Sequence, residues 1–356
     1  MPNRRSSHVK LTPTLGGVAF FASFIVSQIF IQDADETGIG IHFIVAITIL
    51  FFMGLKDDLM VLTSRAKIIL QSTAIFFILI CQELWISNFH GFLGLYVMPF
   101  WVSIPLAYFI ILYIINAYNL IDGIDGLAGM LGVLIAFIYA VIFYKSGQDL
   151  YFYISLVIIG YLMAFLRYNL SGDKKIFMGD TGSMITGFLL SLLSLRFLSL
   201  NTDQLGGLYI NPSNKFIVGL SILFFPVLDV LRVVTMRLLN NKGAFTADRS
   251  HLHHIFIDKG LKHHIASKTI AVSSMLVFLL IYALNLHFSY VALTVYFVII
   301  SLTTFYILLL LDKDPSTKVR RKKMKSYIPE WLYEIEFRIR KSIIFFFKKT
   351  IYKDLL

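Results

Sequence analysis

Residues 116–129, NAYNLIDGIDGLAG, place two asparagines, two aspartates and three glycines between two long apolar runs. VSIPLAYFIILYII precedes this stretch, and MLGVLIAFIYAVIFY follows it. Apolar runs of about 20 residues recur along the chain, and each is long enough to cross a bilayer as a helix. The sequence therefore predicts an all-α, polytopic transmembrane helical bundle that is interrupted by polar motifs.

The composition agrees with a membrane protein. Of the 356 residues, 57% are hydrophobic and only 15% are charged, whereas soluble domains carry about 25% charged residues. The single cysteine, Cys81, excludes an intrachain disulfide and a cysteine-based metal cluster. The net charge of +11 indicates cytoplasmic loops and anionic lipid headgroups, so we expect no nucleic-acid partner.

We expect about ten membrane spans, at residues 15–32, 40–55, 66–84, 99–118, 126–145, 150–168, 183–200, 216–236, 269–287 and 289–311. One set of connections is rich in lysine and arginine and the other set is poor in them, so the positive-inside rule places both termini in the cytoplasm. The expected organisation is a transmembrane domain, residues 1–311, followed by a basic amphipathic cytoplasmic tail, residues 312–356, that binds anionic lipids.

Four polar motifs fall at the cytoplasmic ends or loops of the expected spans: GLKDDLM, NAYNLIDGIDG, FMGDTGS and DRSHLHH. The connections on the other side carry no comparable cluster. Acids at the membrane edge are energetically expensive and mark candidate functional sites. We therefore expect an active site at the cytoplasmic face.

Polar side chains in NAYNLIDGIDG recur every third residue, at Asn116, Asn119, Asp122 and Asp125. Neighbours three residues apart share one face of a helical turn. Hard oxygen ligands of this kind suit Mg²⁺ bound together with substrate phosphates. The alternative, in which the amides only hydrogen-bond between helices, leaves the two aspartates unexplained.

Two other motifs supply further carboxylates. Asp57 and Asp58 directly follow an apolar run, where they either position a phosphate through a cation or simply form a polar span end. Asp180 lies between glycines at the start of a later apolar run. Thr181 and Ser183 are expected to cap the helix that begins there, and a helix N-terminus favours anions.

The motif DRSHLHH gathers Arg249, His251, His253 and His254. Arginine binds phosphate in a bidentate manner, and the histidines can donate to a diphosphate or act as acid and base. Zinc binding is the weaker alternative, because the three histidines have no cysteine nearby. The second histidine pair, residues 263–264, is expected to lie in a solvated loop.

Metal-binding acids, a basic loop and a single membrane face together indicate phosphoryl transfer, in which catalysis is mostly positioning and charge neutralisation. Two other classes of protein are alternatives. A secondary transporter would use NAYNLIDGIDG as a broken helix, but it needs charged groups near the bilayer midplane. A lipid-binding scaffold would explain the basic tail but not the concentrated acids.

In combination and in order, these motifs resemble those of the polyprenyl-phosphate N-acetylhexosamine-1-phosphate transferases. The resemblance extends from PNRRSSHVKLTPTLGG to DRSHLHH, which is nearly the whole chain. It implies transfer of HexNAc-1-phosphate from a UDP-sugar to undecaprenyl phosphate, with release of UMP. It also implies a Mg²⁺ cofactor that Mn²⁺ can replace and a place in the bacterial inner membrane. It allows a homodimer.

The resemblance assigns roles to individual residues. Asp57 and Asp58 match the paired acids that orient or deprotonate the lipid phosphate. Asp180 and Asn119 match the metal ligands, and Asp180 is also counted as catalytic. Lys67 matches a contact to the diphosphate.

Other matches concern the nucleotide sugar. Asp122 and Asp125 match the sugar-nucleotide side of the pocket, where Phe177 stacks on uracil, and Asn116 is counted as a substrate contact. The loop that grips the diphosphate, with His253 as its catalytic member, is matched by Arg249, His251, His253 and His254. The first loop of the family is matched by Thr12, Pro13, Thr14, Gly16 and Gly17.

The histidine motif reads H-x-H-H, which resembles the branch that starts O-antigen, enterobacterial common antigen or teichoic-acid linkage units, usually from UDP-GlcNAc. The alternative branch uses UDP-MurNAc-pentapeptide and has consecutive histidines. Members of the family carry one more span, then Asp-x-Pro, before NRRSSH. Here Met1 precedes Pro2, so we expect either a late start or a missing first helix, and eleven spans with that helix added.

Overall fold

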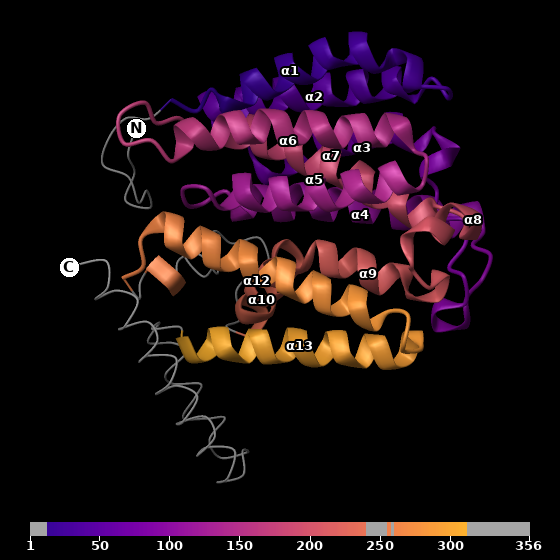
Figure 1. The fold of residues 1–356 in the computed structure, drawn as a ribbon. Coiled ribbons are helices and arrows are strands. Elements are labelled where there is room, and N and C mark those ends of the chain that lie inside the picture. Colours follow the sequence, from indigo (N-terminus) through magenta and orange to yellow (C-terminus); the bar gives the residue numbers. More distant parts are fainter. Residues whose placement is uncertain (1–12, 240–254, 258–259, 312–356) are drawn as a thin grey trace.

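The computed structural model describes residues 13–239, 255–257 and 260–311, which form a bundle of helices (Figure 1). Within these ranges, the only extended pairing is an isolated bridge between Asn88 and Val97. The all-α prediction is therefore confirmed for this part of the chain. Outside the described residues lie the tail, residues 312–356, and the motif residues Thr12, Arg249, His251, His253 and His254.

Eight of the ten expected spans correspond to described helices of similar bounds. The longer helices are α1 (Gly16–Ile31), α2 (Ile39–Leu59), α3 (Ser64–Leu79), α4 (Phe100–Ile121), α5 (Leu127–Lys145), α6 (Asp149–Asn169), α7 (Gly179–Ser199), α9 (Lys215–Ile222), α10 (Phe224–Leu239), α12 (His263–Leu284) and α13 (Tyr290–Leu311). Among the described residues, eight helices are long and apolar enough to cross a membrane, and a bent pair makes a ninth. The chain is a multi-pass membrane protein.

The expected span 66–84 is shorter in the structure. It is the 16-residue helix α3, which begins after its N-cap, Thr63, and ends at Leu79. The indole N–H of Trp85 donates to the carbonyl of Leu79 at 2.8 Å. This bond satisfies one of the carbonyls left over at the helix C-terminus, so the chain turns away there.

The expected span 216–236 is broken. Its two parts, α9 and α10, meet at Leu223 and are bent by 72° relative to each other. Pro226 has no N–H to donate to the carbonyl of Ile222, so the α9 helix cannot continue through this turn. The new helix starts where the N–H of Val227 donates to Leu223 at 3.0 Å.

Helix α7 is the centre of the bundle and carries Asp180. It is almost entirely buried and packs against α1, α2, α4 and α5. Small and hydroxyl residues let neighbouring helices approach it closely. The hydroxyls of Thr186, Ser191 and Ser194 donate to carbonyls of the preceding turn, which satisfies these polar groups inside the bundle.

Two glycines allow α1 and α2 to touch the first turn of α7. A Cβ atom at Gly17 would lie 2.4 Å from the backbone nitrogen of Gly182. A Cβ atom at Gly54 would lie 2.4 Å from the Cα of Thr181. Only glycine fits between these backbones, so the start of α7 is held between two neighbouring helices.

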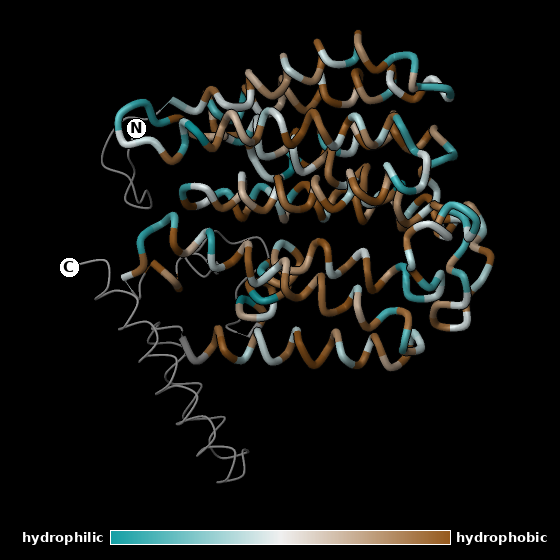
Figure 2. The backbone as a smooth tube through the Cα atoms, in the orientation of Figure 1, coloured by the Kyte–Doolittle hydropathy of each residue, from teal (hydrophilic) through white to brown (hydrophobic). Residues whose placement is uncertain are grey.

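Hydrophobic residues line most of the length of the helices, while hydrophilic residues gather at helix ends and in connections (Figure 2). This distribution suits a bilayer, whose core accepts apolar surface and whose edges accept polar groups. The ends of α2 and α4 and the starts of α1, α3, α7 and α12 come together at one end of the bundle, where the polar motifs lie (Figure 1).

Candidate active site

The start of α7 is capped by an acid from another helix. One oxygen of Asp58 accepts the backbone N–H of Asp180 at 2.8 Å. Its other oxygen accepts the N–H and the hydroxyl of Thr181 at 3.1 and 2.6 Å. The first N–H groups of a helix have no partner within the helix and favour a negative charge. Asp58 therefore fixes the place of Asp180.

The prediction that Thr181 and Ser183 cap α7 is wrong. Thr181 donates to Asp58 instead of accepting from its own helix. Ser183 Oγ donates to the carbonyl of Gly179 at 3.0 Å. Helix α7 has no side-chain cap of its own, because the carboxylate of Asp58 occupies that position.

The loop before α7 is anchored by the start of α1. The N–H of Phe177 donates to Pro13 at 2.9 Å, and the N–H groups of Gly16 and Gly17 donate to Phe177 and Met178, each at 3.1 Å. The stretch PTLGG, residues 13–17, therefore has a structural role, because it holds the loop that leads to Asp180. Gly179 in this loop has φ of +72°, and a Cβ there would lie 2.8 Å from an oxygen of Asp58.

Lys67 connects the paired acids with Asp180. Its ammonium group pairs with Asp57, which is buried, and lies 3.5 Å from Oδ2 of Asp180. On the other side, Nδ2 of Asn119 donates to Oδ1 of Asp180 at 2.6 Å. Residues from α2, α3, α4 and α7 thus form one charged cluster.

Asn116 lies one helical turn before Asn119 and is held by a residue that the sequence analysis missed. Its Nδ2 donates to Oε1 of Gln71 at 3.0 Å and to the carbonyl of Leu112 at 2.7 Å. Gln71 is buried in α3. Its only sequence signal is that it is a lone amide within an apolar run, where such residues mark candidate sites.

Asp125 lies in the acid loop, residues 122–126, between α4 and α5. Nζ of Lys175 lies 2.6 Å from its Oδ2, and Nδ1 of His263 lies 3.1 Å from the same oxygen. The prediction of a solvated loop at residues 263–264 is therefore wrong for His263, which begins α12 and faces the acid loop. His264, the next residue, is exposed.

The two aspartates of the acid loop have opposite electrostatic environments. Burial raises the pKa of Asp122 to about 7, and three nearby carboxylates add to the shift. Burial also acts to raise the pKa of Asp125, but hydrogen bonds from His263 and Lys175 outweigh it and hold the pKa below its usual value. Asp125 is thus a carboxylate at neutral pH, whereas Asp122 can gain or lose a proton there.

The residues that match metal ligands suit magnesium. Within the described ranges, three or more histidine, cysteine or acidic side chains nowhere gather as a ready-made metal site. Mg²⁺ does not need such a cage, because it binds one or two carboxylates together with substrate phosphates and water. Asp180, with Asn119 beside it, offers a donor set of that kind.

Comparison with known proteins gives the family. The sequence model of glycosyl transferase family 4 matches residues 41–198. A probable undecaprenyl-phosphate N-acetylglucosaminyl 1-phosphate transferase from Bacillus subtilis is 31% identical over 274 residues, which cover 74% of this chain and 71% of the relative. This chain belongs to glycosyl transferase family 4.

Two further relatives support the assignment to family 4. A decaprenyl-phosphate N-acetylglucosaminephosphotransferase from Mycobacterium tuberculosis is 30% identical over 286 residues, covering 74% of this chain and 69% of the relative. An undecaprenyl-phosphate alpha-N-acetylglucosaminyl 1-phosphate transferase from Escherichia coli is 26% identical over 289 residues, covering 78% and 73%. The resemblance to polyprenyl-phosphate sugar-phosphate transferases is confirmed, and this family 4 chain is a phosphotransferase.

Phe177 lies in the loop before α7. It is partly buried, and Nζ of Lys175 lies 5.4 Å from its ring centroid. The expected stacking of this ring on uracil stays a prediction, as do the roles of the histidine-loop residues, which lie outside the described residues.

Asn169, at the end of α6, is a second residue that sequence reasoning missed. It is buried, and its Oδ1 accepts the N–H of Gly126 at 2.6 Å. Its Nδ2 donates to the carbonyl of Ile176 at 2.9 Å. One amide therefore joins the acid loop of this family 4 enzyme to the loop that carries Phe177. Its place in the unremarkable stretch RYNLSG carried no signal.

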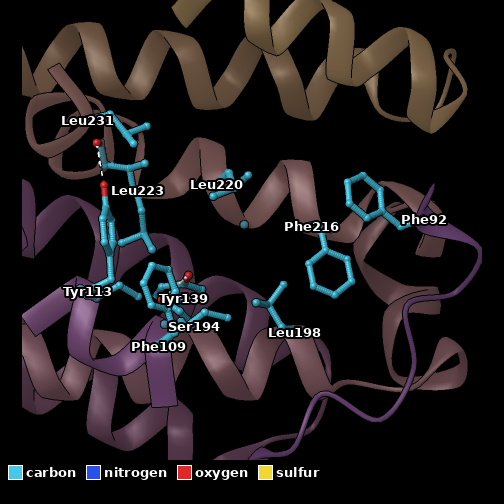
Figure 3. A pocket seen from close by; sticks show the side chains of 14 residues that line it. Phe92, Phe109, Tyr113, Tyr139, Ser194, Leu198, Phe216, Leu220, Leu223 and Leu231 are labelled. Atoms are coloured by element: carbon cyan, nitrogen blue, oxygen red, sulfur yellow. Dashed lines mark hydrogen bonds between the residues drawn. The ribbon is translucent and has the colours of Figure 1, made fainter. Parts of the chain in front are cut away.

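An apolar cavity of about 350 Å³ lies within the bundle (Figure 3). Its walls come from α4, α5, α7, α9 and α10, and include Phe109, Tyr113, Leu198, Phe216 and Leu223. The hydroxyl of Tyr113 donates to the carbonyl of Val227 at 3.0 Å, beside the break between α9 and α10.

Replacing Asp58 by asparagine is expected to destabilise the family 4 fold, because the start of α7 loses its negatively charged cap. Asparagine keeps one acceptor oxygen but presents an N–H₂ donor in place of the other, and losing a hydrogen bond to a charged group costs about 1.5–3 kcal/mol. We expect a lower midpoint of thermal unfolding in detergent. Asp173→Asn, which changes an exposed acid in the loop before α7, is the matched control and should leave the midpoint unchanged. An unchanged midpoint for Asp58→Asn would contradict the capping role.

Proposed function

We propose that this chain transfers HexNAc-1-phosphate, with GlcNAc-1-phosphate the first expectation, from a UDP-sugar to undecaprenyl phosphate. A phosphate oxygen of the lipid attacks the phosphorus that bears the sugar, and the bond from that phosphorus to UMP breaks. The lipid-linked product starts a cell-envelope polysaccharide. The proposed location is the cytoplasmic face of the bacterial inner membrane. The names of the relatives support the transferred group, N-acetylglucosaminyl 1-phosphate, and this acceptor.

The observation that carries the proposal is the charged cluster of Asp57, Lys67, Asn119 and Asp180 at one end of a transmembrane bundle. A site at the membrane edge can receive a soluble nucleotide sugar from the water and a phosphate headgroup from the membrane. Phosphoryl transfer needs chiefly positioned charge, which this cluster provides.

Each residue of the cluster has a role in the proposed reaction. Asp180 and Asn119 would hold Mg²⁺, or Mn²⁺ in its place, which when bound supplies charge neutralisation at the phosphates. Lys67 binds the diphosphate as a cation. Asp57, beside Lys67, orients the lipid phosphate, and Asp58 keeps Asp180 in position by capping α7.

The apolar cavity supports a lipid acceptor. Its walls are almost wholly hydrophobic, and the α4 residues among them, such as Phe109 and Tyr113, precede Asn119 on the same helix (Figure 3). An isoprenoid chain gains free energy by burying its methyl and methylene groups in such a cavity. We infer that isoprene units further along the undecaprenyl chain lie there, while the phosphate reaches Lys67.

Donor choice tests the proposed function. With purified protein, undecaprenyl phosphate and Mg²⁺, UDP-GlcNAc or a related UDP-HexNAc should give lipid-linked product, and UDP-MurNAc-pentapeptide should give none. A pocket that closes over a small sugar excludes the larger donor by steric clash. Product is followed by mass spectrometry and UMP release. Efficient product from the muramyl donor, with none from any UDP-HexNAc, would place the chain in the other branch.

Metal dependence tests how the diphosphate is held. EDTA should stop turnover and excess Mg²⁺ should restore it, whereas a zinc-selective chelator should have no effect. Arg249→Ala and His253→Ala should weaken or abolish turnover, because the motif is expected to grip the diphosphate. Restoration by Zn²⁺ alone would show that the histidines form a zinc site.

A further inference from the structure

Asp125 joins three segments that are far apart in the sequence. Its Oδ2 is shared by Lys175, from the loop before α7, and His263, the first residue of α12. One turn further along α12, the buried hydroxyl of Ser267 donates to the backbone carbonyl of Asp125 at 2.7 Å. Helix α12 therefore contacts both the side chain and the backbone of Asp125 in the acid loop.

Lys175 and His263 differ in exposure from their neighbours in the sequence. Each has a side chain that is 23% exposed, whereas Lys174 and His264 both lie at the surface as exposed residues. An isolated ion pair at the surface contributes little to the stability of the fold. Here two donors share one carboxylate whose side chain is only 16% exposed, and hydrogen bonds in such networks reinforce each other.

Lys175 also links Asp125 to the ring of Phe177. Its Nζ lies 2.6 Å from Asp125 and 5.4 Å from the ring centroid of Phe177. A cation at this distance is attracted by the ring and limits its movement. We call the contacts of Lys175 and His263 with Asp125 the bridge. The bridge sets the spacing between the acid loop and Phe177, the two parts that are expected to enclose the nucleotide.

We propose that Lys175 and His263 are positioning residues for the nucleotide side of the pocket, acting through Asp125. The identity of the nucleotide sugar rests on the proposed function, but the bridge itself does not. Removing either donor lets the acid loop move relative to Phe177 or to α12. Substrate binding then has to restore a spacing that the wild-type chain already has. The affinity for the substrate should therefore fall more than the rate of the chemical step.

The kinetic test uses the full chain in detergent. Lys175→Ala and His263→Ala should each raise the KM for UDP-GlcNAc by about tenfold, with a much smaller change in kcat. Lys174→Ala and His264→Ala, the exposed neighbours, are matched controls and should behave like the wild type. If both bridge variants keep the wild-type KM, or the controls raise it equally, the positioning role is wrong.

Conservative variants at His263 separate the hydrogen bond from the ring. The amide nitrogen of asparagine takes the place of Nδ1, the atom that faces Asp125, whereas that of glutamine takes the place of Nε2. His263→Asn should therefore recover most of the KM, and His263→Gln should not. Equal recovery by both would show that contact with Asp125 is not what matters.

Hydrogen exchange tests the bridge without any substrate. His263→Ala should speed amide exchange in residues 122–126 and 174–178, across the bridge, as well as in the first turn of α12. Faster exchange confined to α12 would overturn the coupling. If the wild type turns over no UDP-sugar while exchange spreads across the bridge, the proposed function fails and the bridge stands.

Discussion

Asp180→Asn is expected to abolish sugar-phosphate transfer in a chain that remains folded. Asparagine keeps the shape of the side chain and can still accept the hydrogen bond that Asn119 donates. It has no charge for Lys67 or for a divalent cation. Losing a charged ligand at a phosphoryl-transfer site should lower turnover by at least about a hundredfold.

The measurement is UMP release from UDP-GlcNAc, with circular dichroism and size exclusion in detergent to show that the variant is folded. Asp173→Asn is the matched control, because Asp173 is an exposed acid in the same loop before α7. It should keep wild-type turnover. Normal turnover by Asp180→Asn, or an unchanged Mg²⁺ titration, would show that Asp180 is not a catalytic metal ligand.

Gly54→Ala is expected to damage both stability and turnover, although it adds one methyl group. That methyl would lie 2.4 Å from the Cα of Thr181 and 2.8 Å from its nitrogen, and backbone atoms cannot rotate away. Helix α2 must therefore move away from α7. Overpacking of this kind costs about 1–3 kcal/mol, and the movement also withdraws Asp58, one turn further along α2, from its capping position.

Gly160→Ala in α6 is the control for this glycine. A Cβ atom at Gly160 would meet nothing within 4 Å, and alanine is favoured over glycine inside a helix by about 1 kcal/mol. The control should unfold at the wild-type temperature or slightly above it, while Gly54→Ala unfolds lower and loses turnover. A wild-type unfolding temperature for Gly54→Ala would show that α2 and α7 are not in such close contact.

The sequence predicted most membrane spans correctly because the signal for a transmembrane helix is local. A helix satisfies its backbone hydrogen bonds within its own segment, so an apolar run of sufficient length defines it. The error at residues 216–236 had a local signal too, since Pro226 cannot continue the hydrogen-bonding pattern of α9. The error at residues 66–84 had no such clear signal in the sequence. The hydrogen bond from Trp85 to Leu79 forms only when the chain folds back after α3.

The candidate site was predicted in its residue types but not in its connections. Asp57, Asp58, Asn119 and Asp180 stood out as polar groups at the ends of apolar runs, and the structure brings them together. Lys175 and His263 did not stand out, because lysine and histidine are ordinary residues in the connections between membrane spans. Their significance depends on their shared contact with Asp125.

Local sequence patterns were enough to establish a helical membrane protein with acids, amides and a basic motif at the ends of its spans. Which of these groups meet depends on the packing of the helices. Asp58 caps a helix 122 residues away, and His263 reaches Asp125 across 138 residues. Hydropathy and helical periodicity describe neighbours within a few turns, whereas these contacts need the close approach of helices that glycines such as Gly17 and Gly54 permit.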